Sequence, residues 1–231
     1  MTSIVLIPAY KPDQRLVSLV KDLCKFKSLN LLIINNGNQS EYLNYFESIS
    51  RFNKVSVLNI KKNQGKGFGI KKGLKYIKSH FKNIENIIFA DADGQHLSED
   101  INKIAITMEN YEQKNLLLVG KRKHNAFTPF KNLIANKFFN FFFKKKHNIN
   151  IDDSLCGLRA IKKSDISLCC DLNYNDFRFE VEMILAYKFK NINIYEKEIE
   201  SIYFRGTKST LFITDVLKLI QILFFFNIRA K

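Results

Sequence analysis

The chain has 231 residues, of which 46% are hydrophobic and 26% charged, and this balance suits a compact globular domain with a buried core. No linker or internal repeat divides it, and no segment reaches the roughly 20 apolar residues of a membrane span. A formal net charge of +15 predicts attraction to polyanions without choosing among lipid, phosphorylated substrates and nucleic acid. The four cysteines match no zinc spacing, so we expect free thiols in a reducing compartment, and we expect no signal peptide.

The first half of the chain alternates short apolar runs with amphipathic stretches. Buried strands are predicted by the apolar runs at 4–7, 31–34, 55–60, 87–90 and 116–119. Helices are predicted between them at 13–26, 42–49, 69–81 and 98–108, and Ser98 is expected to cap the last of these. Continuous apolar strands separated by helices indicate an α/β fold, with a mostly parallel sheet covered by helices on both faces.

The second half is less regular. It predicts, in order, an apolar helix at 130–143, a strand around Gly157 at 155–161, a helix at 179–189, an edge strand at 192–199 and a last helix at 210–226. We therefore expect one α/β domain over residues 1–210, followed by an apolar and basic C-terminal helix within residues 211–231, with possible membrane contact.

Polar clusters follow the predicted strands at their carboxyl ends, which meet at one edge of a parallel sheet and commonly hold the ligand. The sharpest cluster is Asp91-Ala92-Asp93 after the fourth strand. Two carboxylates at this spacing in an extended segment point the same way, and hard oxygen ligands suit Mg²⁺ or Mn²⁺, which leave positions for substrate phosphates. The alternative is an ordinary acidic turn before a helix, and the motif alone does not separate the two.

Several motifs occur in a characteristic order along the chain: IPAY at 7–10, NQGKG at 63–67, DADGQH at 91–96, GKR at 120–122, DDSLCGLRA at 152–160 and FEVE at 179–182. In these motifs the chain resembles family 2 glycosyltransferases of the GT-A type, especially the branch of dolichol-phosphate mannosyltransferase and bacterial polyprenyl-phosphate sugar transferases. The resemblance covers most of the chain, from Ser3 to Thr210. It implies a metal-dependent enzyme that moves a sugar from a nucleotide-sugar donor to a polyprenyl-phosphate or glycan acceptor.

The resemblance also implies a role for each matching residue. The donor would be bound by Pro8, Ala9, Tyr10, Asn36, Lys66, Gly67, Asp91 and Ala92. The metal, Mg²⁺ or Mn²⁺, would be held by Asp91, Asp93 and Gln95. Catalysis would rest on Asp93, Arg122, Asp153, Arg159, Glu180 and Glu182. The two arginines would bind phosphate, because a planar guanidinium holds two oxygens at once, or would form surface ion pairs instead.

Two departures from the family pattern concern the donor site. Lys11 and Pro12 follow the first-strand tyrosine, where the family usually has an acidic residue. Asn35 and Asn36 stand where an aspartate usually reads the base. An asparagine offers both a donor and an acceptor, so it reads a base edge differently from a carboxylate. The donor base is therefore left open between UDP, GDP and other nucleotides.

The acceptor decides whether a general base is needed. A polyprenyl phosphate is already ionised near neutral pH, and cations such as Arg122 and Lys131 would position it. A sugar hydroxyl must lose a proton to a carboxylate, for which Asp153, Glu180 and Glu182 are the candidates. Alternatively, the two glutamates are only favourable charges at the start of a helix.

Phenylalanine-rich segments predict contact with a membrane surface. Five phenylalanines lie just before three lysines: Phe138, Phe139, Phe141, Phe142 and Phe143. Apolar surface beside clustered lysine suits a helix lying on anionic lipid, although a helix that is apolar all round also packs in a core. With no signal expected, this predicts a cytoplasmic protein attached peripherally to the inner face of the membrane.

Two other functions stay open at this point. A sugar nucleotidyltransferase uses a similar α/β core, but it needs a longer glycine-rich basic loop after the first strand than IPAYKPDQ provides. A non-catalytic basic protein would bind membrane or nucleic acid. Nucleic-acid binding calls for basic residues interleaved with aromatics, and the phenylalanine runs here are too apolar and clustered, so we expect no nucleic-acid partner.

Overall fold

The fold is built around one seven-stranded sheet, and the computed structural model describes residues 2–123, 128–200, 202 and 213–225. In chain order the strands are β1 (Thr2–Ala9), β2 (Leu29–Asn36), β3 (Val55–Ile60), β4 (Ile84–Phe89), β5 (Leu117–Arg122), β6 (Arg159–Lys162) and β7 (Ile194–Ile199). Across the sheet their order is β3-β2-β1-β4-β6-β5-β7. Among these strands only β6 runs antiparallel to its neighbours, so the predicted α/β fold with a mostly parallel sheet is confirmed.

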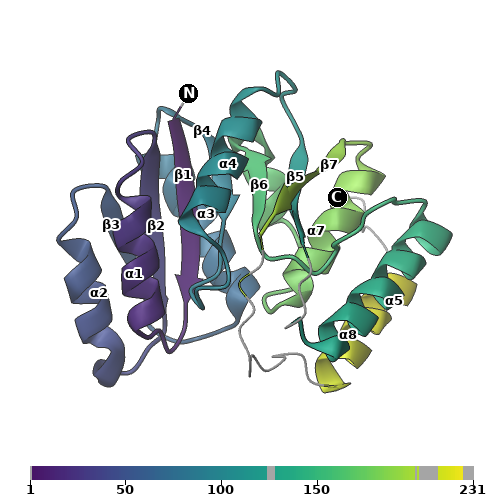
Figure 1. Ribbon diagram of the computed structural model, residues 1–231, viewed down its shortest axis with the longest axis horizontal. Helices are drawn as coiled ribbons and strands as arrows, with labels where there is room; N and C mark the ends of the chain where they lie inside the picture. Colours follow the sequence, from purple (N-terminus) through teal and green to yellow (C-terminus); the bar gives the residue numbers. More distant parts are fainter. Residues whose placement is uncertain (1, 124–127, 201, 203–212, 226–231) are drawn as a thin grey trace.

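Helices cover both faces of the sheet (Figure 1). They are α1 (Gln14–Leu23), α2 (Leu43–Ser50), α3 (Lys66–His80), α4 (Ser98–Glu109), α5 (Phe130–His147), α6 (Ile166–Cys170), α7 (Arg178–Phe189) and α8 (Ile213–Phe225), with short 3₁₀ turns at Ser40–Tyr42 and Lys163–Asp165. α1 packs with α2 and α4, whereas α3 packs with α6 and α7. Figure 1 shows α5 and α8 side by side at the β5–β7 end of the molecule.

The central strands are apolar along their length because both of their faces are covered. Residues 4–7 of β1 and 31–34 of β2 are fully buried. Each strand predicted in the first half of the chain is present, and β7 lies at the edge of the sheet as predicted. The carboxyl ends of β1, β2 and β4 therefore meet at one edge, where the polar clusters follow them.

Two local predictions are wrong. Ser98 does not cap α4, because the helix begins at Ser98 itself and the Ser98 hydroxyl donates to the carboxylate of Glu99 at 3.0 Å. The strand predicted around Gly157 starts only at Arg159, since Ser154 and Leu155 form a turn and residues 156–158 are not part of a strand.

The phenylalanines of α5 divide between the core and the surface. Phe139 and Phe143 are fully buried, so the structure corrects the lipid contact predicted for these two side chains. Phe138 and Phe141 are 37% and 57% exposed, and Phe142 is half-buried. The segment is thus a helix with one buried face and one exposed apolar face.

α8 packs on α5 and α7. Its side chains Leu219, Ile222 and Leu223 are buried, and Nε2 of His147 at the end of α5 donates to the backbone carbonyl of Leu223 at 3.0 Å. Residues 210–212 and 226–231 of the predicted C-terminal segment lie outside the described residues. Within the described part of the chain, every helix is too short or too polar to cross a membrane.

Candidate active site

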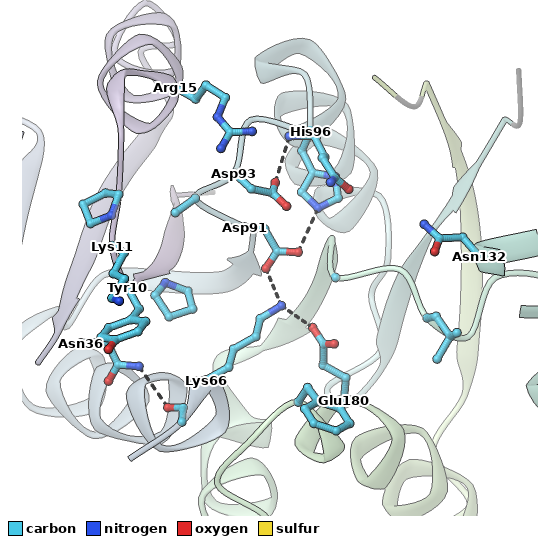
Figure 2. Close-up of a pocket in the computed structure, with 18 of the residues that line it drawn as sticks. Tyr10, Lys11, Arg15, Asn36, Lys66, Asp91, Asp93, His96, Asn132 and Glu180 are labelled. Atoms are coloured by element: carbon cyan, nitrogen blue, oxygen red, sulfur yellow. Dashed lines mark hydrogen bonds and ion pairs between the residues drawn. The ribbon is translucent and has the colours of Figure 1, made fainter. Parts of the chain in front are cut away.

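A pocket of about 620 Å³ lies at the carboxyl ends of β1, β2 and β4, the edge at which the sequence predicted a site. Many of the predicted site residues line it: Pro8, Tyr10, Asn36, Lys66, Asp91, Ala92, Asp93, Gln95, Arg122 and Glu180. They come from segments far apart in the chain, which the parallel sheet brings to one place (Figure 2).

The remaining predicted residues lie behind the pocket wall: Ala9, Gly67, Asp153, Arg159 and Glu182. Gly67 serves helix packing, because a Cβ there would lie 2.7 Å from the Cβ of Phe179. Arg159 is 1% exposed, and its guanidinium donates to the backbone carbonyls of Ser154, Cys156 and Glu180. The structure therefore gives Arg159 a role in holding the main chain around the pocket.

The aspartate pair follows β4 directly. Gly94 adopts a φ of +73° and turns the chain after Asp93, whose Oδ1 accepts the backbone N–H of Gln95 at 3.0 Å. Burial and the neighbouring carboxylate of Asp91 raise the pKa of Asp93. A divalent cation bound here would offset both effects, because it favours the ionised carboxylate.

Lys66 at the start of α3 joins this pair to α7. Its ammonium forms ion pairs with Oδ1 of Asp91 and, at 2.8 Å, with Oε1 of Glu180 (Figure 2). Burial opposes the charge of Lys66, but the two carboxylates outweigh burial and raise the pKa of its ammonium. Burial likewise opposes the charge of Asp91, and Lys66 outweighs it and lowers the pKa of that carboxyl. Lys66 and Asp91 therefore both stay ionised.

The carboxylates of Asp91 and Asp93 are suitable ligands for Mg²⁺ or Mn²⁺. Within the described residues, no group of three or more histidine, cysteine, aspartate and glutamate side chains converges on one point. Mg²⁺ and Mn²⁺ usually take only one or two carboxylates and complete their coordination with water and substrate phosphates. The pair beside an open pocket fits that kind of cation.

Two contacts of Asp91 on the pocket wall, with Gly157 and with His96, were not predicted from the sequence. A Cβ on Gly157 would overlap Oδ2 of Asp91 and lie 3.2 Å from Nζ of Lys66, so any other residue here would displace the Asp91 carboxylate. His96 is 5% exposed, and its Nε2 lies 3.6 Å from Oδ2 of Asp91, too far for a hydrogen bond. Neither the size limit at Gly157 nor this distance has a local sequence signal.

Asp13 supplies a carboxylate near the position where the family's usual acidic residue is missing. Its Oδ1 accepts the backbone N–H of Arg15 at 2.9 Å, which caps α1, and its Oδ2 pairs with the Arg15 guanidinium at 2.7 Å. Both side chains line the pocket, and Figure 2 shows Arg15 on the same side as Asp93. The helix-start pattern signals the cap, but not its place in the pocket.

Of the two asparagines that end β2, only Asn36 faces the pocket. Asn35 instead donates to the side chain of Asn59 and accepts from Asn38. The Nδ2 of Asn36 donates to the backbone carbonyl of Gly65 at 3.1 Å, which fixes the amide orientation. Its Oδ1 is buried and has no hydrogen-bond partner among the described residues, so it is an acceptor that lacks a donor.

The fold and this site are those of a nucleotide-sugar-dependent transferase, and comparison with known proteins agrees. The model of glycosyl transferase family 2 matches residues 4–167, and the chain belongs to that family. It is therefore a glycosyltransferase. The alternatives of a sugar nucleotidyltransferase and of a non-catalytic basic protein are not supported.

Named relatives and solved structures extend the likeness over most of the chain. The chain is 25% identical to a dolichyl-phosphate beta-glucosyltransferase of Dictyostelium discoideum, covering 92% of this chain and 70% of that protein. It is 26% identical to a UDP-N-acetylglucosamine--dolichyl-phosphate N-acetylglucosaminyltransferase of Methanococcus voltae, covering 86% and 85%. The fold is similar to the crystal structure of glucosyl-3-phosphoglycerate synthase from Mycobacterium tuberculosis with Mn²⁺, UDP-glucose and phosphoglyceric acid, with a TM-score of 0.72, 12% identity and coverage of 96% and 78%.

Proposed function

We propose that this glycosyltransferase transfers a sugar from a nucleotide-sugar donor to the phosphate of a polyprenyl phosphate, with Mg²⁺ or Mn²⁺ bound at Asp91 and Asp93. The observation that carries the choice of acceptor is that each carboxylate suggested as a general base already has a partner. Two of the relatives are named for dolichyl-phosphate acceptors, which supports the same choice.

Asp153 and Glu182 are both 1% exposed and lie outside the pocket lining. Asp153 accepts from the guanidinium of Arg122 through both oxygens, at 2.7 and 2.8 Å. Glu182 accepts the backbone N–H groups of Asn173 and Tyr174 at 2.8 and 2.9 Å. Carboxylates held in this way do not reach an incoming hydroxyl, so neither supports a hydroxyl acceptor.

Glu180 alone among the three candidates lines the pocket, and its Oε1 already accepts from Lys66. A phosphate acceptor removes the need for a base, because its oxygen is ionised before it attacks. In that case Lys66 and Arg122, both on the pocket wall, would each exchange a carboxylate partner, Glu180 or Asp153, for the acceptor phosphate. A cation bound to the aspartate pair would stabilise the negative charge on the leaving diphosphate.

The donor nucleotide is proposed to bind between Pro8, Tyr10 and Asn36, on the wall formed by β1 and β2. Because Oδ1 of Asn36 lacks a donor, it favours a base that presents a ring N–H group, as uracil and guanine do. Cytosine and adenine present acceptors at the corresponding ring nitrogen, so they would reach the amide oxygen only through their exocyclic amino groups. This supports UDP or GDP as the carrier.

The protein is further proposed to lie on the cytoplasmic face of a membrane through α5. Its exposed apolar side chains recur at helical spacing: Phe130, Ile134, Phe138 and Phe141, at 74%, 52%, 37% and 57% exposure. Lys137, Lys144 and Lys145 on the same helix are exposed. An apolar stripe bordered by lysine suits the surface of anionic lipid. The free thiols of all four cysteines agree with a reducing compartment.

The proposal is tested by incubating the protein with UDP- or GDP-sugars, Mn²⁺ and a prenyl phosphate in anionic liposomes, and measuring sugar transfer to lipid. We expect transfer with one of the two nucleotides. Glu180→Gln should keep at least about a tenth of the rate, whereas loss of a general base costs about a hundredfold or more. A loss of that size, or transfer only to sugar hydroxyls, would reject the phosphate acceptor.

A further inference from the structure

The pocket has two chemically different parts. One part, toward β1, β2 and β4, is lined by charged and amide side chains such as Arg15, Asn36 and Asp93. Four apolar side chains from the segment before β6, the start of α7 and α8 line another part of it, beside the polar Ser154 and Glu180: Leu155, Phe177, Val181 and Leu219. Leu155 and Phe177 are half-buried, whereas Val181 and Leu219 are 1% and 2% exposed. These apolar side chains line a pocket of a chain whose net charge is +15.

We propose that this apolar wall binds the first isoprene units of the acceptor, and that α8 is thereby part of the acceptor site. The inference rests on the proposed phosphate acceptor and adds the residues that hold its lipid chain. Glu180 and Val181 are consecutive in α7, so the apolar wall begins next to the Lys66–Glu180 ion pair. A phosphate held by the cations of the pocket would have its attached chain against Val181 and Leu219.

The helix that supplies Leu219 connects this wall to the exposed apolar face of α5. α8 packs on α7 and on α5, and Leu219, Ile222 and Leu223 are buried in that contact. Nζ of Lys218 lies 5.9 Å from the ring centroid of Phe177, which places α8 beside the second half-buried side chain of the wall. The apolar wall of the pocket and the face proposed to meet lipid therefore belong to the same packed pair of helices.

A small hydrophilic acceptor would gain nothing from these four side chains. The solved structure named above contains phosphoglyceric acid, an acid without an apolar tail. The apolar wall here predicts the opposite preference, because burying roughly two methylene groups is worth about tenfold in affinity. The chain should thus prefer a phosphate attached to an apolar tail over a phosphate attached to a small hydrophilic acid.

The test compares farnesyl phosphate with 3-phosphoglycerate as acceptors for the wild type, Leu219→Gln and Ile106→Gln. Ile106 is 52% exposed on α4, outside the pocket, and serves as the control for adding an amide. We expect the wild type to favour farnesyl phosphate by at least about a hundredfold in kcat/KM, as burial of several carbons implies. Leu219→Gln should raise KM for farnesyl phosphate about tenfold, with kcat and nucleotide affinity kept. Ile106→Gln should match the wild type.

Leu155→Gln, at a half-buried position, repeats the test if Leu219→Gln does not fold, and we expect the same rise in KM. Equal use of both phosphates by the wild type overturns the apolar subsite while leaving the proposed reaction intact. An unchanged KM in a folded variant that still binds nucleotide also overturns it. Absence of transfer to either phosphate, combined with no calorimetric binding of farnesyl phosphate, rejects the subsite and the proposed acceptor class together.

Discussion

The ammonium nitrogen of Lys66 lies 2.8 Å from Oε1 of Glu180, so that the first residue of α3 is tied to α7 across the pocket. The same ammonium pairs with Asp91 at the end of β4. One cation therefore joins three elements that are distant in sequence and lies between two carboxylates that would otherwise repel each other. The arrangement of the site before any ligand binds depends on this lysine.

Replacing Lys66 by methionine should leave the carboxylates of Asp91 and Glu180 without their counterion. The side chains are 27%, 27% and 16% exposed, so screening by water reduces the effect but does not remove it. We expect a loss of about 2 kcal/mol in the free energy of unfolding, below the range for a fully buried pair. Chemical denaturation measures it. A variant as stable as the wild type would show that the ion pairs contribute little to the fold.

Gly157→Ala should disturb the site through size alone. The added methyl group overlaps Oδ2 of Asp91, so this carboxylate must move away from Lys66. We expect nucleotide affinity in the presence of Mn²⁺ to fall about tenfold or more, together with an overpacking cost of about 1–3 kcal/mol.

The matched control for Gly157→Ala is Gly73→Ala, whose methyl group meets Leu6 in the core between α3 and β1. It should lower stability by a similar amount of about 1–3 kcal/mol and leave nucleotide affinity unchanged. If both variants lost nucleotide affinity equally, the effect of Gly157→Ala would be a general loss of packing and not a displacement of Asp91.

His147 should make the attachment of α8 sensitive to acid. Burial lowers the pKa of His147 below its ordinary value of 6.5, so the unfolded chain binds a proton more readily than the folded one. Stability is then unaffected by this residue above about pH 6.5 and falls as the pH drops through the folded pKa. The melting temperature of the wild type should fall more than that of His147→Gln between about pH 7.5 and pH 5.5. Parallel curves for the two proteins would contradict this role.

The strands and their order along the chain were predictable because burial on both faces leaves a continuous apolar run, as at 4–7 and 31–34. The position of Asp91 and Asp93 at the ligand-binding edge followed from the same pattern. The start of α4 was not predictable from Ser98, since a serine is favoured at the cap, whereas here Leu97 occupies the cap position without a side-chain hydrogen bond. The turn before β6 was also missed, because Cys156 and Leu158 are buried like strand residues although they lie outside the strand.

The sequence predicted which residues gather at the candidate site. It did not predict which of them face the pocket and which only hold the surrounding chain in place. Glu180 and Glu182 lie two positions apart in α7, which places them about 200° apart around a helix. Only Glu180 therefore faces the pocket, while Glu182 holds the turn at Asn173. The contact of Lys66 with Glu180 joins residues 114 positions apart, and a single sequence gives no local signal for such a pair.

Calorimetric titration of UDP and GDP, with and without Mn²⁺, on the wild type and Asp93→Asn measures whether Asp93 holds a metal that binds the donor nucleotide. Asp93→Asn keeps the size of the side chain and removes the charge that a divalent cation needs. We expect one of the two nucleotides to bind the wild type only with Mn²⁺, and the variant to lose at least about tenfold in affinity while keeping its fold. Equal binding with and without the metal, or an unchanged affinity in Asp93→Asn, would contradict this expectation.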